Sequence, residues 1–344
     1  MKKKILAAVM AAAMVLSLTA CGGAKGSEAK VYKVGVVNYV DDASLNQIID
    51  NLEKELDKKG AELGVTFNYA DFYDNAQADT ATLNQIGANM VADDVDIIVA
   101  VATPTASVMM SATEDTDIPI VFAAASDPVG SGLVASMDAP GGKVTGTSDG
   151  LDANALINLI LAANPDTAKV GLLYDTAQGA STTAIAQAKE ILDGKGIAWV
   201  EKTGSTTDEV LLAAESLVAE GVDAVFTPTD NTIMAAEQPV AQVFADAKIP
   251  HYCGADSFAL WGAFCGYGVN YADLGTATGD LVVDILVNGA DPAKTPVVTF
   301  DNGIVSVNTE TTAAIGYDLE TIKKAFEPIA TQFNELTTQQ EFEE

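Results

Sequence analysis

Two stretches of the chain, VAVATPTASVMMSAT at residues 99–113 and AVFTPTDNTIMAAEQ at residues 224–238, follow one pattern. Each begins with an apolar run that contains β-branched residues, continues with Thr-Pro-Thr and ends in helix-forming residues. Proline suits the first turn of a helix, where a backbone N–H has no intrahelical partner. Each stretch therefore predicts a buried strand that turns directly into a helix, and the repetition predicts two similar units.

Alternating signals for strands and helices surround the first stretch. In residues 43–63, the apolar side chains recur at helical spacing on one face. The predicted strands are 30–40, 65–72, 96–103 and 118–126, and the predicted helices are 43–63, 78–92 and 104–113. This order indicates a parallel sheet with helices on both faces.

The same alternation begins again after GGKVTGTSDG, residues 141–150. The predicted strands are 168–175, 197–204, 223–230, 249–256 and 262–269, and the predicted helices are 156–165, 179–194, 207–220 and 232–245. A helix at 274–287, strands at 297–300 and 303–308 and a helix from Leu319 to Phe326 are too short for a third domain. We therefore expect them to complete two α/β lobes, each with its own sheet.

The first twenty residues have the pattern of a secretory signal peptide. A basic MKKK precedes an apolar segment that is too short to span a membrane, and Leu18, Thr19, Ala20 and Cys21 follow. These four residues resemble the lipobox of bacterial lipoproteins, which implies cleavage before Cys21 and lipid on its sulfur. Residues 21–30 then read as a flexible polar tether. Residues 331–344 read as an acidic C-terminal tail.

The composition of the 344-residue chain excludes several classes of function. Its formal net charge of −30 argues against nucleic-acid binding. All 18 basic residues are lysines, so an anionic group on a ligand must be held by backbone N–H groups, hydroxyls, a helix N-terminus or lysine. His251 is the single histidine, and no GxSxG, HExxH or P-loop motif is present. We therefore expect no enzyme, no metal and no cofactor.

Polar and aromatic residues follow the predicted strands, where ligands bind in open parallel sheets. The two Thr-Pro-Thr corners lie at such ends, and Thr103 is a candidate N-cap of the first helix. In the second corner Asp230 and Asn231 are also good caps, so that helix can start two or three residues later. The candidate binding residues are Asn38, Tyr39, Thr103, Thr105, Ser126, Asp127, Tyr174, Asp230, Asn231 and Asp256. Donors, carboxylates and aromatic faces together suit an α-amino acid.

The chain from about Val31 to Phe326 resembles the substrate-binding lipoproteins of ABC transporters, especially the subgroup associated with tryptophan and other aromatic amino acids. The stretches that carry the resemblance are VGVVNYVDD, VAVATPTA, ASDPVGSGLV, VTGTSD, VGLLYD, FTPTDNTI and YGVNYADLG, in that order. The resemblance implies a type I periplasmic binding protein, in which two Rossmann-like lobes are joined by three crossovers. It places the first lobe at 31–147 plus 270–300 and the second at 148–269 plus 301–330.

The resemblance also implies roles for several candidate residues. Thr103 and Thr105, with Ser126 nearby, would meet the carboxylate of the ligand, and Asp230 would meet its ammonium. Tyr39 and Tyr174 would form a wall for its side chain. The chain would act as a monomer at the outer face of the cytoplasmic membrane and deliver its ligand to an ABC permease.

Several alternatives stay open at this stage. The ligand could be a branched or other apolar amino acid or a sugar, and the protein could present its ligand to a sensor instead of a permease. A secreted enzyme on the same fold would need a catalytic cluster that the sequence does not offer. Cys253 and Cys265 could form a disulfide in an exported protein or remain two buried thiols.

Overall fold

The computed structural model describes residues 29–339 and 341–342, and Val31–Glu344 forms one compact unit. The predicted signal peptide, Cys21 and the predicted tether up to residue 28 lie outside the described residues. No helix in the described part of the chain is both long enough and apolar enough to cross a membrane.

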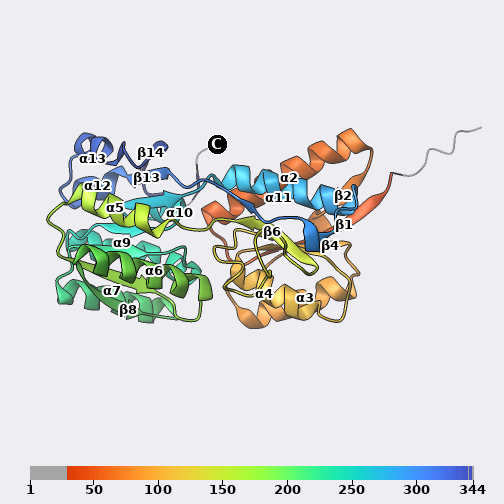
Figure 1. Ribbon diagram of the computed structural model, residues 1–344, viewed down its shortest axis with the longest axis horizontal. Helices are drawn as coiled ribbons and strands as arrows, with labels where there is room; N and C mark the ends of the chain where they lie inside the picture. Colours follow the sequence, from red (N-terminus) through yellow and green to blue (C-terminus); the bar gives the residue numbers. More distant parts are fainter. Residues whose placement is uncertain (1–28, 340, 343–344) are drawn as a thin grey trace, which may run out of the picture. The chain divides into compact units, whose positions relative to one another are not determined.

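The first of two sheets has the strand order β12-β6-β5-β4-β1-β2, and the short β3 also pairs with β1. All of its pairs are parallel. Its strands are β1 (Val31–Asn38), β2 (Thr66–Asn68), β3 (Tyr73–Asn75), β4 (Ile97–Val101), β5 (Ile120–Ala123), β6 (Val144–Ser148) and β12 (Val298–Thr299). Helices α2 (Ala43–Leu63) and α11 (Tyr271–Leu286) cover one face, and α3 (Thr80–Ala92) and α4 (Thr103–Ala112) the other (Figure 1).

The second sheet has the strand order β14-β13-β11-β10-β9-β7-β8 and is parallel except for the pair of β11 with β13. Its strands are β7 (Lys169–Tyr174), β8 (Ala198–Thr203), β9 (Ala224–Thr227), β10 (His251–Cys253), β11 (Cys265–Gly268), β13 (Ile304–Asn308) and β14 (Gln332–Leu336). Its helices are α5 (Ala153–Ala163), α6 (Gly179–Lys195), α7 (Thr207–Glu220), α8 (Asn231–Ala235), α9 (Glu237–Asp246), α10 (Asp256–Leu260), α12 (Thr309–Ala314) and α13 (Leu319–Phe326). Apolar residues of α5, α6 and α13 pack on one face and those of α7 and α9 on the other.

The chain crosses three times between the sheets: from β6 to β7, from β11 to α11 and β12, and from β12 to β13. We call the elements around the first sheet the first lobe and those around the second sheet the second lobe. The predicted fold class, two Rossmann-like α/β lobes joined by three crossovers, is confirmed. The two remaining elements, η1 (Ala70–Phe72) and η2 (Pro292–Lys294), are short 3-10 turns.

One strand was not predicted, and three local predictions are wrong. Residues 144–148 lie in GGKVTGTSDG, for which no strand or helix was predicted from the sequence, and they form the buried strand β6. The strand predicted over 65–72 ends at Asn68 and gives way to η1. The helix predicted over 232–245 is divided at Ala236, since Pro239 in the first turn of α9 has no N–H to continue the α8 ladder. The predicted tail contains β14, which pairs with β13.

Both Cys253 and Cys265 are buried free thiols. They lie on the neighbouring strands β10 and β11, but the register places Cys265 beside Tyr252 instead of Cys253. The disulfide considered from the sequence therefore does not form in this structure, and the two side chains act as small apolar core residues.

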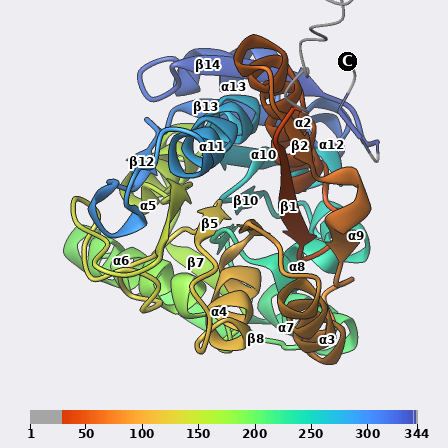
Figure 2. The same ribbon diagram turned by 90° about the vertical axis from the view of Figure 1, so that its right-hand side faces the viewer.

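Close packing of α11 on α2 depends on Gly275, and both views place these helices side by side (Figures 1 and 2). A Cβ atom at this position would collide with the carbonyl oxygen of Ile48. We expect Gly275→Ala to lower the free energy of unfolding by about 1–3 kcal/mol, because rigid backbone must move apart. The matched control is Gly194→Ala in α6, where a Cβ atom meets nothing within 4 Å.

Because alanine is the better helix former, Gly194→Ala should leave stability unchanged or raise it by up to about 1 kcal/mol. Chemical denaturation of both variants measures the contrast. Equal effects of the two substitutions would show that α2 and α11 do not need this close approach.

Candidate ligand-binding site

A cavity of about 360 Å³ lies between the two lobes. Strand ends and helix N-termini of both lobes line it, which is the position where open parallel sheets bind ligands. The first lobe contributes residues that follow β1, β4 and β5, and the second contributes residues that follow β7, β9 and β10. The candidate residues were likewise selected from the sequence at the ends of strands.

Four of the ten predicted residues line this cavity: Thr103, Ser126, Asp230 and Asn231. Asp127 instead lines a smaller neighbouring cavity of about 170 Å³. The other five do not line the main cavity. They are Asn38, Tyr39, Thr105, Tyr174 and Asp256.

These five residues have other surroundings. The Tyr174 hydroxyl donates to Glu201 Oε2 at 3.0 Å, and the amide of Asn38 donates to Asn46 Oδ1 at 3.4 Å. Thr105 is fully buried in α4, and its hydroxyl has no partner among the described residues. Burial, together with the charges of Asp175 and Asp230, raises the pKa of Tyr39, so this ring lies near the acidic part of the second lobe.

At the first Thr-Pro-Thr corner, Ala102 is the N-cap of α4, and the prediction that Thr103 caps this helix is wrong. Thr103 and Pro104 are its first two residues. Ala102 has a φ of 73° and a ψ of 153°, a backbone conformation that side chains disfavour. No side chain caps the helix, so the N–H donors of its first turn remain open towards the cavity that Thr103 and Pro104 line.

The second corner is built differently. Here α8 begins at Asn231, three residues after Pro228, and Asp230 is its cap, as the sequence suggested. The cavity instead receives the N-terminus of α6, which also lacks a side-chain cap. Its first two residues, Gly179 and Ala180, line the cavity, and the buried Ser181 behind them lies close enough to Asp230 to lower the pKa of that carboxyl group.

The N-termini of α4 in the first lobe and α6 in the second, both without a side-chain cap, thus lie at the same cavity. Asp, Asn or Thr side chains cap α2, α3, α5, α7, α11 and α13. Free N–H donors at the positive end of a helix dipole favour an anionic group. The arrangement offers a carboxylate site to a chain that has no arginine.

Carboxylates dominate the charged lining. Asp42, Asp149 and Asp230 line the cavity, and no lysine or histidine of the described residues does. Burial raises the pKa of Asp42 and of Asp149 and raises that of Asp230 to about 6. Buried carboxylates without a cationic side chain destabilise one another, so the cavity favours a ligand that brings a positive charge.

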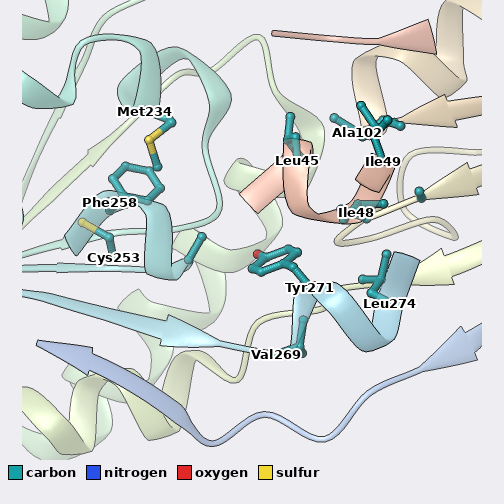
Figure 3. Packing of buried hydrophobic residues seen from close by; sticks show 14 of the residues in the cluster. Leu45, Ile48, Ile49, Ala102, Met234, Cys253, Phe258, Val269, Tyr271 and Leu274 are labelled. Carbon is teal, nitrogen blue, oxygen red and sulfur yellow. The ribbon is translucent and has the colours of Figure 1, made fainter. Parts of the chain in front are cut away.

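The apolar wall comes from both lobes. Met234 and Phe258 belong to the second lobe, and Leu45 and Tyr271 face them from the first (Figure 3). The Tyr271 hydroxyl donates to Asp149 Oδ2 at 3.4 Å. Sequence reasoning chose Tyr39 and Tyr174 for such a wall and missed Phe258 and Tyr271.

Both missed aromatic residues carried a signal in the sequence. Phe258 is the third residue of α10, the helix that follows β10, and Tyr271 follows Asn270, the N-cap of α11. Each therefore lies in the first turn after a strand, as Asp230 does after β9.

Two hydrogen bonds join the lobes beside the cavity. The Ser44 hydroxyl in the first turn of α2 donates to Asp256 Oδ1 at 2.7 Å and accepts from the backbone N–H of Ser257 at 3.3 Å. Burial raises the pKa of Asp256 to about 6, and the charge of Asp42 adds to this effect. Asp256 was predicted as a ligand residue, and the structure places it in a contact between the lobes.

One group of side chains among the described residues has donors close enough for a metal ion: Glu237, His251 and Cys253. All three are buried in the second lobe. Both ring nitrogens of His251 are already hydrogen-bonded, Nε2 with Thr227 Oγ1 at 2.8 Å and Nδ1 with Glu237 Oε1 at 3.0 Å. The histidine is therefore satisfied within a buried polar network, whereas Glu237 Oε2 has no hydrogen-bond partner in the described structure.

Comparison with known proteins identifies the family. A model of the ABC transporter substrate-binding protein family matches residues 33–327. The chain belongs to this family. It is 33% identical over 324 residues to a tyrosine-binding protein of Clostridioides difficile strain R20291, covering 91% of this chain and 92% of that protein.

Solved structures of family members share the fold. An ABC domain of Streptococcus pneumoniae in complex with L-Trp has a TM-score of 0.80 at 30% identity, covering 88% of this chain and 100% of that one. The ligand-free, open structure of a substrate-binding protein with adhesive properties from Clostridium difficile has a TM-score of 0.66 at 30% identity, covering 90% and 100%. At equal identity, this ABC transporter substrate-binding protein is thus more similar in structure to the L-Trp complex than to the open form.

Proposed function

We propose that this protein is the extracytoplasmic binding protein of an ABC importer and that it binds an aromatic α-amino acid, such as tryptophan or tyrosine, between its lobes. The cavity carries this proposal, because it combines an apolar and aromatic wall, buried carboxylates and uncapped helix N-termini. An amino acid needs all three: a wall for its side chain, an acceptor for its ammonium and donors for its carboxylate.

The relatives support an aromatic ligand. The L-Trp complex from Streptococcus pneumoniae and the tyrosine-binding protein from Clostridioides difficile are both about one-third identical to this chain and cover most of it. Phe258 and Tyr271 offer aromatic faces, and Met234 offers a polarisable thioether. A sugar would leave these buried carboxylates without a cation, and a branched amino acid would not use the aromatic faces.

We also propose the cellular setting that the sequence indicates. Lipid on Cys21 would anchor the monomeric protein at the outer face of the cytoplasmic membrane. Residues 21–30 would link this anchor to the two lobes, which would comprise 31–147 plus 270–300 and 148–269 plus 301–330. The protein would pass its ligand to the permease without catalysing a reaction. Presentation of the ligand to a membrane sensor is the second possibility, and it would require the same ligand-binding residues in the cavity.

Thermal and calorimetric titration of the purified protein tests the ligand class. L-Trp, L-Tyr and L-Phe should raise the melting temperature, because a ligand at a hundred times its Kd stabilises the folded state by about 2.7 kcal/mol. L-Leu, L-Val and glucose at the same concentrations are the controls. A larger shift with glucose or with L-Leu than with every aromatic amino acid would contradict the proposed ligand.

A further inference from the structure

The carboxylate of Asp42 is only half satisfied. Asp42 follows β1 and caps α2, and its Oδ1 accepts from the backbone N–H groups of Ser44 and Leu45 at 3.0 and 3.1 Å. Its Oδ2 is buried and has no hydrogen-bond partner in the described structure. The side chain lines the cavity and is only 7% exposed, and no described residue satisfies this oxygen.

The other carboxylates of the cavity are occupied. Asp230 Oδ1 accepts from the Gln178 amide at 2.9 Å and from the N–H groups of Thr232 and Ile233, both at 3.0 Å, and Oδ2 accepts from the N–H of Asp175 at 2.8 Å. In Asp149, Ser126 donates to Oδ1 at 2.9 Å and Tyr271 donates to Oδ2. Each of these oxygens already accepts at least one hydrogen bond, whereas Oδ2 of Asp42 accepts none from the described residues.

Among the described side chains that neighbour Asp42, none brings a positive charge, and only the Ser257 hydroxyl opposes the effect of burial on its pKa. The hydroxyl of Ser257 donates to Met234 Sδ at 3.8 Å, and Asp256 brings a second carboxylate close to it. Burial raises the pKa of Asp42 although backbone N–H groups oppose this effect. A buried acceptor that is left unpaired costs free energy, and a cationic donor would recover it.

We propose that Asp42, and not Asp230, accepts the ammonium of the bound ligand, with Oδ2 as the receiving atom. The inference rests on the proposed amino-acid function and assigns one of its two charged contacts. Asp230 then positions α8 and the loop after β7 instead of touching the ligand charge. Because Asp42 caps the helix whose Ser44 bonds to Asp256, the ammonium would bind where the two lobes meet.

The position of Asp42 also restricts the class of ligand. Leu45 and Tyr271 line the same cavity and give it apolar surface. In such surroundings a charge-assisted hydrogen bond is strong, and its absence is costly. The cavity should therefore discriminate between an aromatic amino acid and the same molecule without its amino group.

Calorimetric titration of the wild type and of Asp42→Asn tests the assignment with three probes: L-tryptophan, its deamino analogue indole-3-propionate and its decarboxylated analogue tryptamine. Asparagine is as good an N-cap as aspartate, so the start of α2 should persist. Asp42→Asn should weaken binding of L-tryptophan and tryptamine by about 10- to 100-fold. Binding of indole-3-propionate should change by less than about threefold or improve, because a like charge is removed.

Asp230→Asn is the matched control, since it alters a carboxylate of the same cavity. It should affect the three probes to a similar degree, as expected of a residue that supports the fold of the second lobe. The assignment is overturned if Asp42→Asn leaves L-tryptophan binding unchanged, if it weakens all three probes equally, or if Asp230→Asn weakens only the two amines.

The wild type separates this inference from the proposed function. If it binds tryptamine in a manner that depends on Asp42 but binds no amino acid, the amino-acid function fails and the role of Asp42 stands. If it binds none of the probes or L-tyrosine, both proposals fail.

Discussion

Replacement of His251 by leucine should lower the free energy of unfolding by about 3–5 kcal/mol, the range found when one partner of a buried pair is removed. His251 is 1% exposed and Glu237 is fully buried. The histidine is the only hydrogen-bond partner of this carboxyl group in the described structure, because Glu237 Oε2 already has none. Leucine would therefore leave both carboxyl oxygens buried and unpaired, and Thr227 Oγ1 would lose its bond as well.

Two further variants distinguish loss of polar partners from loss of volume. Glu237→Gln keeps an acceptor for His251 and removes a carboxyl group whose pKa burial raises, so stability should change by less than about 1 kcal/mol. The double variant Glu237→Leu/His251→Leu should recover most of the loss, because neither polar group remains. Urea unfolding at pH 7 measures all three variants. A double variant as unstable as His251→Leu would show that packing, not polarity, holds this site together.

This network also bears on the binding site. The ring of His251 packs edge-on against Phe258, with centroids 6.4 Å apart, and Phe258 forms part of the cavity wall. A sequence with one histidine gives no sign of this role, since its partner Glu237 lies 14 residues away in another element. The buried pair thus connects the core of the second lobe with the surface that faces the ligand.

The fold was predictable because the sequence of each segment alone indicates whether that segment forms a strand or a helix. Each strand and helix carries its own periodicity, and the repeated Thr-Pro-Thr corners mark the same strand-to-helix turn in both lobes. The strand β6 was missed because its Val-Thr-Gly-Thr-Ser sequence lacks the apolar run of a buried strand. Its burial is imposed by its neighbours β5 and β12, which no local pattern can reveal.

The binding site was predictable only in part, since it depends on how the two lobes meet. Asp230 was found because its role as a helix cap follows from local sequence. Asp42 lies in VVNYVDD, but nothing local shows which of its residues will face the other lobe. That choice depends on contacts such as the bond from Ser44 to Asp256, across 212 residues. Tyr174 does not line the cavity, because the direction of its side chain, towards Glu201 on β8, depends on the pairing of β7 with β8.

The stability of the ligand-free protein should fall as the pH rises from about 4 to about 7. Burial raises the pKa of Asp256 to about 6 from an ordinary value of 3.8. Between these values the folded state binds more protons than the unfolded state, so raising the pH favours unfolding. One pKa unit corresponds to about 1.4 kcal/mol, so this group alone lowers stability by up to about 3 kcal/mol over that interval. Asp230, whose pKa burial also raises to about 6, acts in the same direction.

Asp256→Asn isolates the contribution of this group. Asparagine keeps an oxygen for the Ser44 hydroxyl but cannot ionise, so it resembles the protonated aspartate. The variant should therefore match the wild type at pH 4 and exceed its stability at pH 7.5 by up to about 3 kcal/mol. Chemical denaturation at both pH values measures the difference. Asp291→Asn is the control, because Lys294 lowers the pKa of this exposed carboxyl group, so its substitution should change the pH dependence of stability in the opposite direction. If Asp256→Asn were less stable than the wild type at pH 7.5, the Asp256 carboxylate would stabilise the contact between the lobes in its charged form, contrary to the effect of its burial.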